Sequence, residues 1–385
     1  MQLPRNKCSA LIALIWAFVL VLPGSIAANE TDAELRAMIG QMLLVGFVGT
    51  SPESAGARRS ARQIDRGEIG GVILMDRNVR SPAQIKALTS KLRNTSYPLT
   101  PIISVDQEGG LVQRLSARKG FKAYPTARTV ARLYKPDKAR RIYGAMAREL
   151  AEAGFNLNYG PVLDLNINRA NPVIGRLGRS YGSDPDDVLA YARAFISAHR
   201  AENILTSVKH FPGHGSSWTD SHKRFVDLTK TWKEVEIQPY VELAKSGEID
   251  TLMVGHLYHP AFSDDRRLPA SLTSKAIEGW VRARLGFQGV VITDDLEMAA
   301  VRKHHNLQQT LIMAVNGGND MLLFSSAGAD ANFVPKATKI ILDAVRNGTI
   351  SHARIRQAYT RIAALKQRLG KQPRTPGGML SRFTR

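Results

Sequence analysis

The chain has 385 residues, of which 44% are hydrophobic and 22% are charged, and it carries a single cysteine. This composition excludes a disordered or fibrous protein and fits one large or two medium globular domains, while the lone cysteine excludes a disulfide framework or a cysteine-rich metal site. The formal net charge of +20 favours contact with something anionic, such as nucleic acid, a membrane surface or a cell-wall polymer.

Residues 1–28 have the layout of a secretory signal peptide. Arg5 and Lys7 form a basic start, and an uncharged apolar run follows over residues 10–22. That run is shorter than the ~20 residues that a membrane-spanning helix needs, which disfavours the alternative of an uncleaved anchor. We expect cleavage near Ala27/Ala28 and a protein that is exported, either periplasmic or secreted.

From residue 35 onward, eight short apolar runs alternate with stretches of helical period. The runs are rich in Val, Ile, Leu or Met, as expected for strands that are buried on both faces. They cover residues 42–48, 71–75, 101–105, 156–163, 205–209, 252–255, 289–293 and 320–324. Helices are predicted over residues 83–93, 138–153, 186–202, 233–245, 274–285 and 307–316, and Ser183-Asp184-Pro185 is a typical helix start.

Eight strands that alternate with helices predict an α/β fold of the (β/α)8 TIM-barrel type. We expect a single catalytic domain over residues 29–370. An open, doubly wound sheet is the alternative, but its glycine-rich phosphate fingerprint is missing. The chain ends in a basic stretch with Pro and Gly that starts at Lys366, and we expect residues 371–385 to be poorly ordered.

Polar residues follow five of the predicted strands, at the end of a barrel where chemistry takes place. They are Asp106-Gln107-Glu108, Asp164, Lys209-His210, His256 and Asp294-Asp295. Charged groups beside buried strands are costly unless they are paired or used, so five such positions at one rim predict an active site.

The segment 209–222 contains several side chains that could bind a metal or take part in catalysis. His210 and His214 are four apart, which suits a metal only on a helix, and Pro212 with Gly213 forbids a helix there. We therefore expect no metal and no other cofactor.

The same segment contains an Asp-x-His pair, Asp220 and His222. In an extended chain, residues two apart point the same way, so Asp220 could hold one ring nitrogen and leave the other free for proton transfer. The alternative is a loop histidine that only orders its surroundings.

Asp294 is the first charged residue after the strand at 289–293, and such a carboxylate could attack a sugar carbon. The alternative role is capping of the next helix, which we prefer for Asp295.

Residues 105–110 predict a tight turn that directs Asp106 to the rim, where it could bind sugar hydroxyls. Glu108 could form an ion pair with Arg114 beneath the site.

The run Lys209–His222, which reads KHFPGHG and then DSH, and the segment Thr293–Met298 resemble glycoside hydrolase family 3, in its branch of single-barrel β-N-acetylglucosaminidases. The resemblance extends from about residue 35 to about residue 325. It implies that Asp294 is the nucleophile, that His222 is the acid/base and that Asp220 is its partner.

The resemblance also implies that Asp106, Arg114, Lys209 and His210 contact the terminal N-acetylglucosamine. An arginine in an I-G-x-R-[ST]-[FY] pattern belongs to the same set. This sequence has two extra residues there, so we choose Arg179, immediately before Ser-Tyr, with Arg176 as the alternative.

These features predict a retaining exo-β-N-acetylglucosaminidase that acts on peptidoglycan fragments or chito-oligosaccharides. The alternatives are an N-acetylglucosamine-specific phosphorylase on the same site and a non-catalytic cell-wall sugar-binding protein. The basic charge could also bring contact with an anionic cell wall or membrane surface. No arginine-rich helix with interleaved aromatic residues is present, so we expect no nucleic-acid partner.

Overall fold

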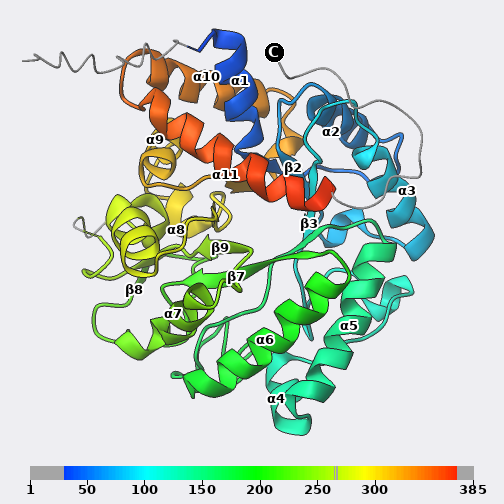
Figure 1. Ribbon diagram of the computed structural model, residues 1–385, viewed down its shortest axis with the longest axis vertical. Helices are drawn as coiled ribbons and strands as arrows, with labels where there is room; N and C mark the ends of the chain where they lie inside the picture. Colours follow the sequence, from blue (N-terminus) through cyan, green and yellow to red (C-terminus); the bar gives the residue numbers. More distant parts are fainter. Residues whose placement is uncertain (1–29, 264, 266–267, 371–385) are drawn as a thin grey trace, which may run out of the picture.

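The computed structural model describes residues 30–263, 265 and 268–370 (Figure 1). The predicted signal peptide, residues 1–28, and the predicted tail, residues 371–385, lie outside the described residues and stay predictions. No helix in the described part of the chain is long and apolar enough to span a membrane.

Eight parallel strands form the central barrel. In ring order they are β1 (Leu43–Val45), β2 (Gly71–Ile73), β3 (Ile102–Val105), β6 (Leu157–Asn158), β7 (Leu205–Phe211), β9 (Thr251–Val254), β11 (Val290–Thr293) and β12 (Leu322–Phe324). β12 pairs with β1, and a parallel bridge between Ile292 and Met321 connects β11 to the start of β12, so the ring closes. Each strand overlaps one predicted run. The TIM-type barrel is confirmed, and the open sheet is wrong because the two outermost strands meet.

Every residue of these eight strands is buried. Side chains fill the inside of the ring and helices cover its outside, which explains why the strands read as continuous apolar runs.

Helices surround the barrel. They are α1 (Asp32–Gln41), α2 (Ala55–Asp65), α3 (Pro82–Arg93), α4 (Ala127–Leu133), α5 (Pro136–Glu152), α6 (Pro185–Ala201), α7 (Gln238–Lys245), η5 (Lys275–Arg284), α8 (Ala299–Arg302), α9 (Leu307–Asn316), α10 (Phe333–Arg346) and α11 (His352–Gly370). All six predicted helices are present, and Asp184 caps α6 by accepting the N–H of Asp186. Figure 1 shows α5 and α6 side by side, and α1 packs against α10 and α11 so that the first and last helices close the outer layer.

β6 is shorter than its predicted run, 156–163, because the N–H of Gly160 turns back to the Asn158 carbonyl at 2.9 Å and Pro161 has no N–H to donate. Pairing resumes at a bridge between Val162 and Lys209, and the N–H of Leu163 donates to the Lys209 carbonyl at 2.7 Å. This path delivers the next residue, Asp164, to the end of β7.

The loops that follow the strands contain two small sheets. β4 (Gln107–Gly109) and β5 (Val112–Gln113) form a hairpin, and β8 (Val226–Asp227) pairs with β10 (Leu257–Tyr258). Gly109 and Gly110 have φ angles of 101° and 61°, which glycine adopts at little cost. The tight turn predicted over residues 105–110 is wrong in its extent, because residues 107–109 form β4 and the chain turns at residues 110–111.

A cluster of buried charges lies at the amino ends of the strands. Asp320, fully buried and just ahead of β12, binds Arg282, Arg354 and Arg361 at 2.7, 2.8 and 3.1 Å. Two of these arginines lie on α11, so the ion pairs fasten the last helix to this end of the barrel.

Lys366 is also buried on α11. Its Nζ donates to Gln41 Oε1 and to the Gly70 carbonyl, both at 2.6 Å, just ahead of β1 and β2. Burial lowers the pKa of Lys366 to about 7. The expectation that the basic tail starts at Lys366 is therefore wrong, because residues 366–370 belong to the helix.

Asp320→Asn should destabilise the protein by about 3–5 kcal/mol, because three guanidinium groups lose the buried anion that they share. The measurement is the midpoint and slope of urea unfolding followed by circular dichroism. Asp343→Asn is a matched control that should leave the midpoint unchanged, since Asp343 pairs with Lys339 on the exposed surface of α10. Equal midpoints for the two variants would contradict the prediction.

Candidate active site

A cavity of ≈ 440 Å³ opens at the carboxyl ends of the barrel strands. It is lined by all eight side chains that the sequence predicted for catalysis or sugar binding: Asp106, Arg114, Arg179, Lys209, His210, Asp220, His222 and Asp294. Arg176, the alternative to Arg179, is exposed and does not line the cavity. The barrel thus brings together residues that lie far apart in the sequence.

Asp294 directly follows β11, and its Oδ1 accepts the N–H of Asp295 at 2.8 Å. Burial alone would raise the pKa of Asp294. The nearby rings of His256, His210 and His222, together with the N–H group, outweigh burial and hold the pKa below its usual value. The carboxylate is therefore ionised at neutral pH at the wall of the cavity.

Asp220 and His222 form the predicted pair. Asp220 Oδ1 accepts hydrogen bonds from His222 Nδ1 at 2.8 Å and from its backbone N–H at 2.9 Å. The contact is confirmed, but the expected extended backbone is wrong, because the Asp220 side chain closes a turn onto the backbone of His222 and Ser221 between them is buried.

This pairing leaves the other ring nitrogen available. The His222 side chain is 60% exposed, and within the described residues no hydrogen bond involves its Nε2. Burial would raise the pKa of Asp220, but the two hydrogen bonds from His222 outweigh it and keep the pKa low. The anionic Asp220 therefore holds the proton on Nδ1 and leaves Nε2 to exchange protons in the cavity.

Lys209 lies at the centre of a cluster of charges. Its side chain is 2% exposed, and its Nζ lies 2.8 Å from Asp106 Oδ1 and 2.6 Å from Glu108 Oε1. Arg114 approaches the other oxygen of Asp106 at 3.4 Å. Burial would raise the pKa of Asp106, but Lys209 and Arg114 outweigh it and hold the pKa below its usual value.

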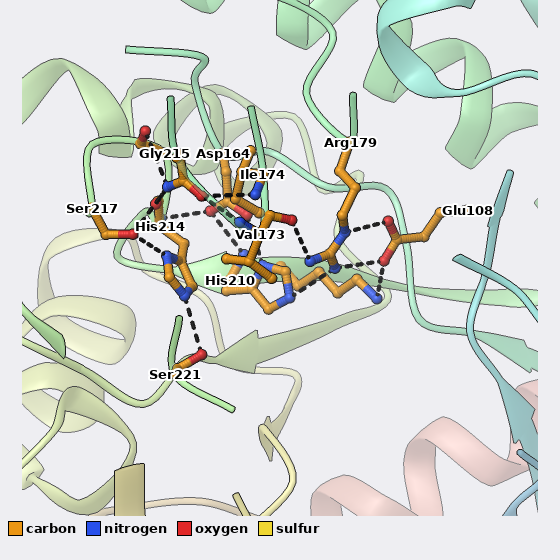
Figure 2. Close-up of polar contacts among 12 residues, drawn as sticks. Glu108, Asp164, Val173, Ile174, Arg179, His210, His214, Gly215, Ser217 and Ser221 are labelled. Carbon is orange, nitrogen blue, oxygen red and sulfur yellow. Dashed lines mark hydrogen bonds and ion pairs between the residues drawn. The ribbon is translucent and has the colours of Figure 1, made fainter. Parts of the chain in front are cut away.

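Arg179 grips Glu108 with two hydrogen bonds (Figure 2). Its Nε and Nη2 donate to the two carboxylate oxygens at 2.8 Å, and its Nη1 donates to the Val173 carbonyl at 3.1 Å. The expected ion pair between Glu108 and Arg114 is wrong, because Arg114 pairs with Asp106 while the loop after β6 brings Arg179 to Glu108. Burial would raise the pKa of Glu108, but Arg179 and then Lys209 hold it well below its usual value.

Asp164 is fully buried and binds both ends of the segment 210–214 (Figure 2). Its Oδ2 accepts from His210 Nδ1 at 2.7 Å, and its Oδ1 accepts the backbone N–H of His214 at 2.7 Å. His210 Nε2 is thereby directed to Arg179 Nη2, 3.4 Å away. Asp164 thus sets the orientation of the His210 ring.

His214 binds the loop that carries the Asp220–His222 pair. Its Nδ1 lies 2.8 Å from Ser217 Oγ and its Nε2 lies 3.1 Å from Ser221 Oγ (Figure 2). Asn171 Nδ2 donates to Ser217 Oγ at 2.9 Å. Burial lowers the pKa of His214 to about 4, so the ring is neutral.

In the described part of the chain, no group of three or more His, Cys, Asp or Glu side chains is arranged to hold a metal.

Asp295 does not cap a helix, so that expectation is wrong. The next helix, α8, begins at Ala299 with Met298 as its N-cap. Asp295 Oδ1 instead accepts the N–H groups of Glu297 at 3.1 Å and Ser325 at 3.2 Å. It therefore ties the loop after β11 to the loop after β12, beside the nucleophile candidate.

Asp164 and His256 are two of the rim residues for which the sequence predicted no role. Asp164 orients His210. The His256 ring binds Ser271 Oγ at 2.7 Å and the Asp295 carbonyl at 2.9 Å, and its charge lowers the pKa of Asp294. Their position after predicted strands was a usable signal. Their partners were not predictable, because those partners come from other strands and loops.

The arrangement defines the chemistry that the cavity can support. An ionised carboxylate can attack an electrophilic carbon, and an imidazole held by a carboxylate can give and take a proton. The paired charges of the walls offer many hydrogen-bonding groups, which suits a ligand rich in hydroxyl groups.

Comparison with known proteins agrees with this chemistry. The family model described as "Glycosyl hydrolase family 3 N terminal domain" matches residues 34–365. The chain is 34% identical to a β-hexosaminidase of Xylella fastidiosa, over 73% of this chain and 82% of the relative. It is 29% identical to β-hexosaminidase A of Pseudoalteromonas piscicida over 89% of its own length, but spans only 63% of that relative.

This chain is also similar to a solved structure. That structure is of a glycoside hydrolase family 3 β-N-acetylglucosaminidase from a Paenibacillus species, with a TM-score of 0.80 and 32% sequence identity. The match covers 90% of this chain and 65% of the other.

Glu108→Gln should destabilise the protein by about 3 kcal/mol at pH 7, because Arg179 loses its buried anion and Lys209 keeps only one of its two, Asp106. The pKa of Glu108 is lower in the folded than in the unfolded state, so its contribution is complete above the ordinary carboxyl pKa of 4.5 and is lost as the pH falls below that value. Urea midpoints of wild type and variant should therefore converge below pH 4.5. Glu53→Gln at an exposed pair is the control, and a gap independent of pH would contradict the prediction.

Proposed function

Because the chain belongs to glycoside hydrolase family 3, we propose that it is a retaining exo-β-N-acetylglucosaminidase, which removes terminal β-linked N-acetylglucosamine. The observation that carries this proposal is the ionised Asp294 in the same cavity as the Asp220–His222 pair. These groups supply the nucleophile and the proton donor that two-step glycoside hydrolysis needs.

In the first step, an Asp294 oxygen attacks the anomeric carbon while the bond from that carbon to the glycosidic oxygen breaks. Protonated His222 gives the proton on Nε2 to the leaving oxygen and becomes a neutral imidazole. Asp220 keeps the Nδ1 proton in place throughout. A glycosyl ester on Asp294 and a free alcohol result.

In the second step, water attacks the same carbon and the bond to Asp294 breaks. His222 Nε2 takes the proton from that water and returns to its protonated form. Two displacements at one carbon restore the β configuration. An imidazole suits this exchange because its neutral form does not repel the nearby anionic nucleophile.

We propose that Asp106, Arg114, Arg179, Lys209 and His210 hold the terminal sugar. All five line the same cavity as Asp294. Lys209 and Arg114 pair with Asp106, while Arg179 pairs with Glu108 and His210 with Asp164, so their positions are fixed before substrate arrives. Preformed polar groups bind hydroxyl and amide groups with little loss of conformational entropy.

The substrate that we propose is a peptidoglycan fragment or a chito-oligosaccharide. The relatives named β-hexosaminidase support N-acetylglucosamine as the sugar. The excess of 53 Lys and Arg over 33 Asp and Glu favours the anionic peptidoglycan fragments. Such fragments also fit the exported location inferred from residues 1–28.

Asp294→Ala should reduce kcat on 4-nitrophenyl N-acetyl-β-glucosaminide by about 10⁴-fold or more, because the other described carboxylates of the cavity, Asp106, Asp220 and Asp295, are engaged by partners within the protein. His222→Ala should lose less on this substrate, since nitrophenol leaves readily, and about 10²–10⁴-fold on an oligosaccharide that needs the acid. Nitrophenol release and product sugar are measured without added metal.

The controls for this experiment concern the acceptor and the stereochemistry. The first product seen by proton NMR should be the β-anomer. A requirement for inorganic phosphate would make phosphate the acceptor, and an inert wild type with and without phosphate would reject the catalytic assignment in favour of sugar binding.

Arg179→Ala should lower kcat/KM by at least about tenfold, because Arg179 lines the cavity and holds Glu108. Arg176→Ala is the matched control and should stay near wild type, since its side chain is exposed outside the cavity. Steady-state kinetics on the nitrophenyl substrate decide between them. The reverse ranking would assign the sugar contact to Arg176.

A further inference from the structure

Glu236 is a buried carboxyl group that the mechanism above does not use. It lies in η3 (Glu234–Ile237), just ahead of α7, and is 0% exposed. Its Oε1 accepts the backbone N–H of Lys233 at 3.1 Å, whereas its Oε2 is buried without a hydrogen-bond partner. Among the described residues, no cationic side chain forms an ion pair with Glu236. A carboxyl in such surroundings is costly when it is charged.

This carboxyl lies directly beneath the start of the loop that carries the Asp220–His222 pair. A Cβ atom added to Gly213 would lie 2.9 Å from Glu236 Cβ and 3.0 Å from Oε2, so the loop backbone rests on this side chain. Trp232, four residues before Glu236, donates its Nε1–H to the Pro212 carbonyl at 3.1 Å. The segment 232–236 therefore supports the loop where it leaves β7.

Three polar groups face the Glu236 carboxyl from the elements packed around it. They are Asp164 from the loop after β6, Ser216 from the supported loop and Tyr240 from α7. Ser216 Oγ and Tyr240 Oη are themselves buried without a partner in standard hydrogen-bond geometry. Burial is the main cause that raises the pKa of Glu236 to about 7; Asp164 adds to it, and Ser216 opposes it.

We propose that Glu236 is a positioning residue, which in its uncharged form supports the loop that carries Asp220 and His222 and which loosens that loop when it ionises. The inference rests on the role proposed above for the Asp220–His222 pair. An uncharged carboxyl carries no charge that burial would penalise. An ionised Glu236 would be a second anion beside Asp164 under the loop. Movement of the loop would admit water and so lower the cost of burying these two charges.

The direction of the pH effect follows from linkage. Between the ordinary carboxyl pKa of 4.5 and about 7, the packed loop holds a proton that the loosened loop releases. Loosening therefore becomes easier as the pH rises through this interval. Glutamine has the same shape and cannot ionise, so Glu236→Gln should remove the dependence.

The first readout is hydrogen exchange of peptides covering residues 212–224 at pH 5.5 and pH 8, corrected for the intrinsic exchange rate. Protection should fall about tenfold in wild type and stay constant in Glu236→Gln. Glu242→Gln on α7 is the matched control, since Glu242 forms a surface pair with Lys245, and it should behave as wild type.

The second readout is the pH profile of kcat/KM on N,N′-diacetylchitobiose, whose sugar leaving group needs the acid. In wild type, kcat/KM should fall as the pH approaches and passes 7. In Glu236→Gln, this fall should occur at a higher pH. Ser216→Ala should also shift the fall of kcat/KM to a higher pH, because the Ser216 side chain favours the ionised carboxyl. This variant tests the proposal if Glu236→Gln does not fold.

Equal pH dependence of loop protection in wild type and Glu236→Gln would overturn the proposal, as would an unmoved transition in Ser216→Ala. A wild type that shows the exchange effect but hydrolyses no N-acetylglucosaminide at any pH would instead reject the proposed function and leave the support of the loop intact.

Discussion

Charges buried at the open end of the barrel must find partners on other strands, and this requirement organises the whole site. Lys209 on β7 meets Asp106 after β3 and Glu108 in β4, while Arg179 from the loop after β6 grips Glu108. A buried charge without its partner is strongly unfavourable, so the barrel can close correctly only if these pairs form. The same pairs then present their remaining hydrogen-bonding capacity to the cavity.

The two groups that we propose to react, Asp294 and His222, are held in different ways. Asp294 follows a fully buried strand, so the barrel sets its position. His222 is an exposed side chain on a loop, and its position depends on contacts below it: Asp164 to His214, and His214 to Ser221. A fixed carboxylate and an accessible imidazole fit the proposed reaction, in which a leaving sugar departs and water enters.

The buried polar contacts at the opposite end of the barrel stabilise the fold and involve none of the proposed catalytic residues. There Asp320 binds three arginines and Lys366 binds two carbonyl oxygens, which ties α11 across the amino ends of the strands. Changes at that end should alter the free energy of unfolding without altering the cavity. TIM-type barrels separate stability and chemistry between their two ends in this manner.

The sequence by itself determined the number and order of the barrel strands, since runs that are apolar on both faces can only be buried there. It also determined the rim residues and the contact between Asp220 and His222, because two residues separated by a single position lie within reach of each other. The backbone turn that makes this contact was missed, since Asp220 bonds the backbone of its own loop.

Only the tertiary structure decided which charges pair across the site. Arg114 was the nearer cation to Glu108 along the chain, yet Arg179, 71 residues away, binds it. Likewise, Lys366 reads as part of a basic tail until α11 buries it, and Glu236 is only one residue of the helix predicted over 233–245 until the loop at Gly213 covers it. Local contacts follow from chain geometry, whereas the partner of a buried charge depends on how the ring of strands closes.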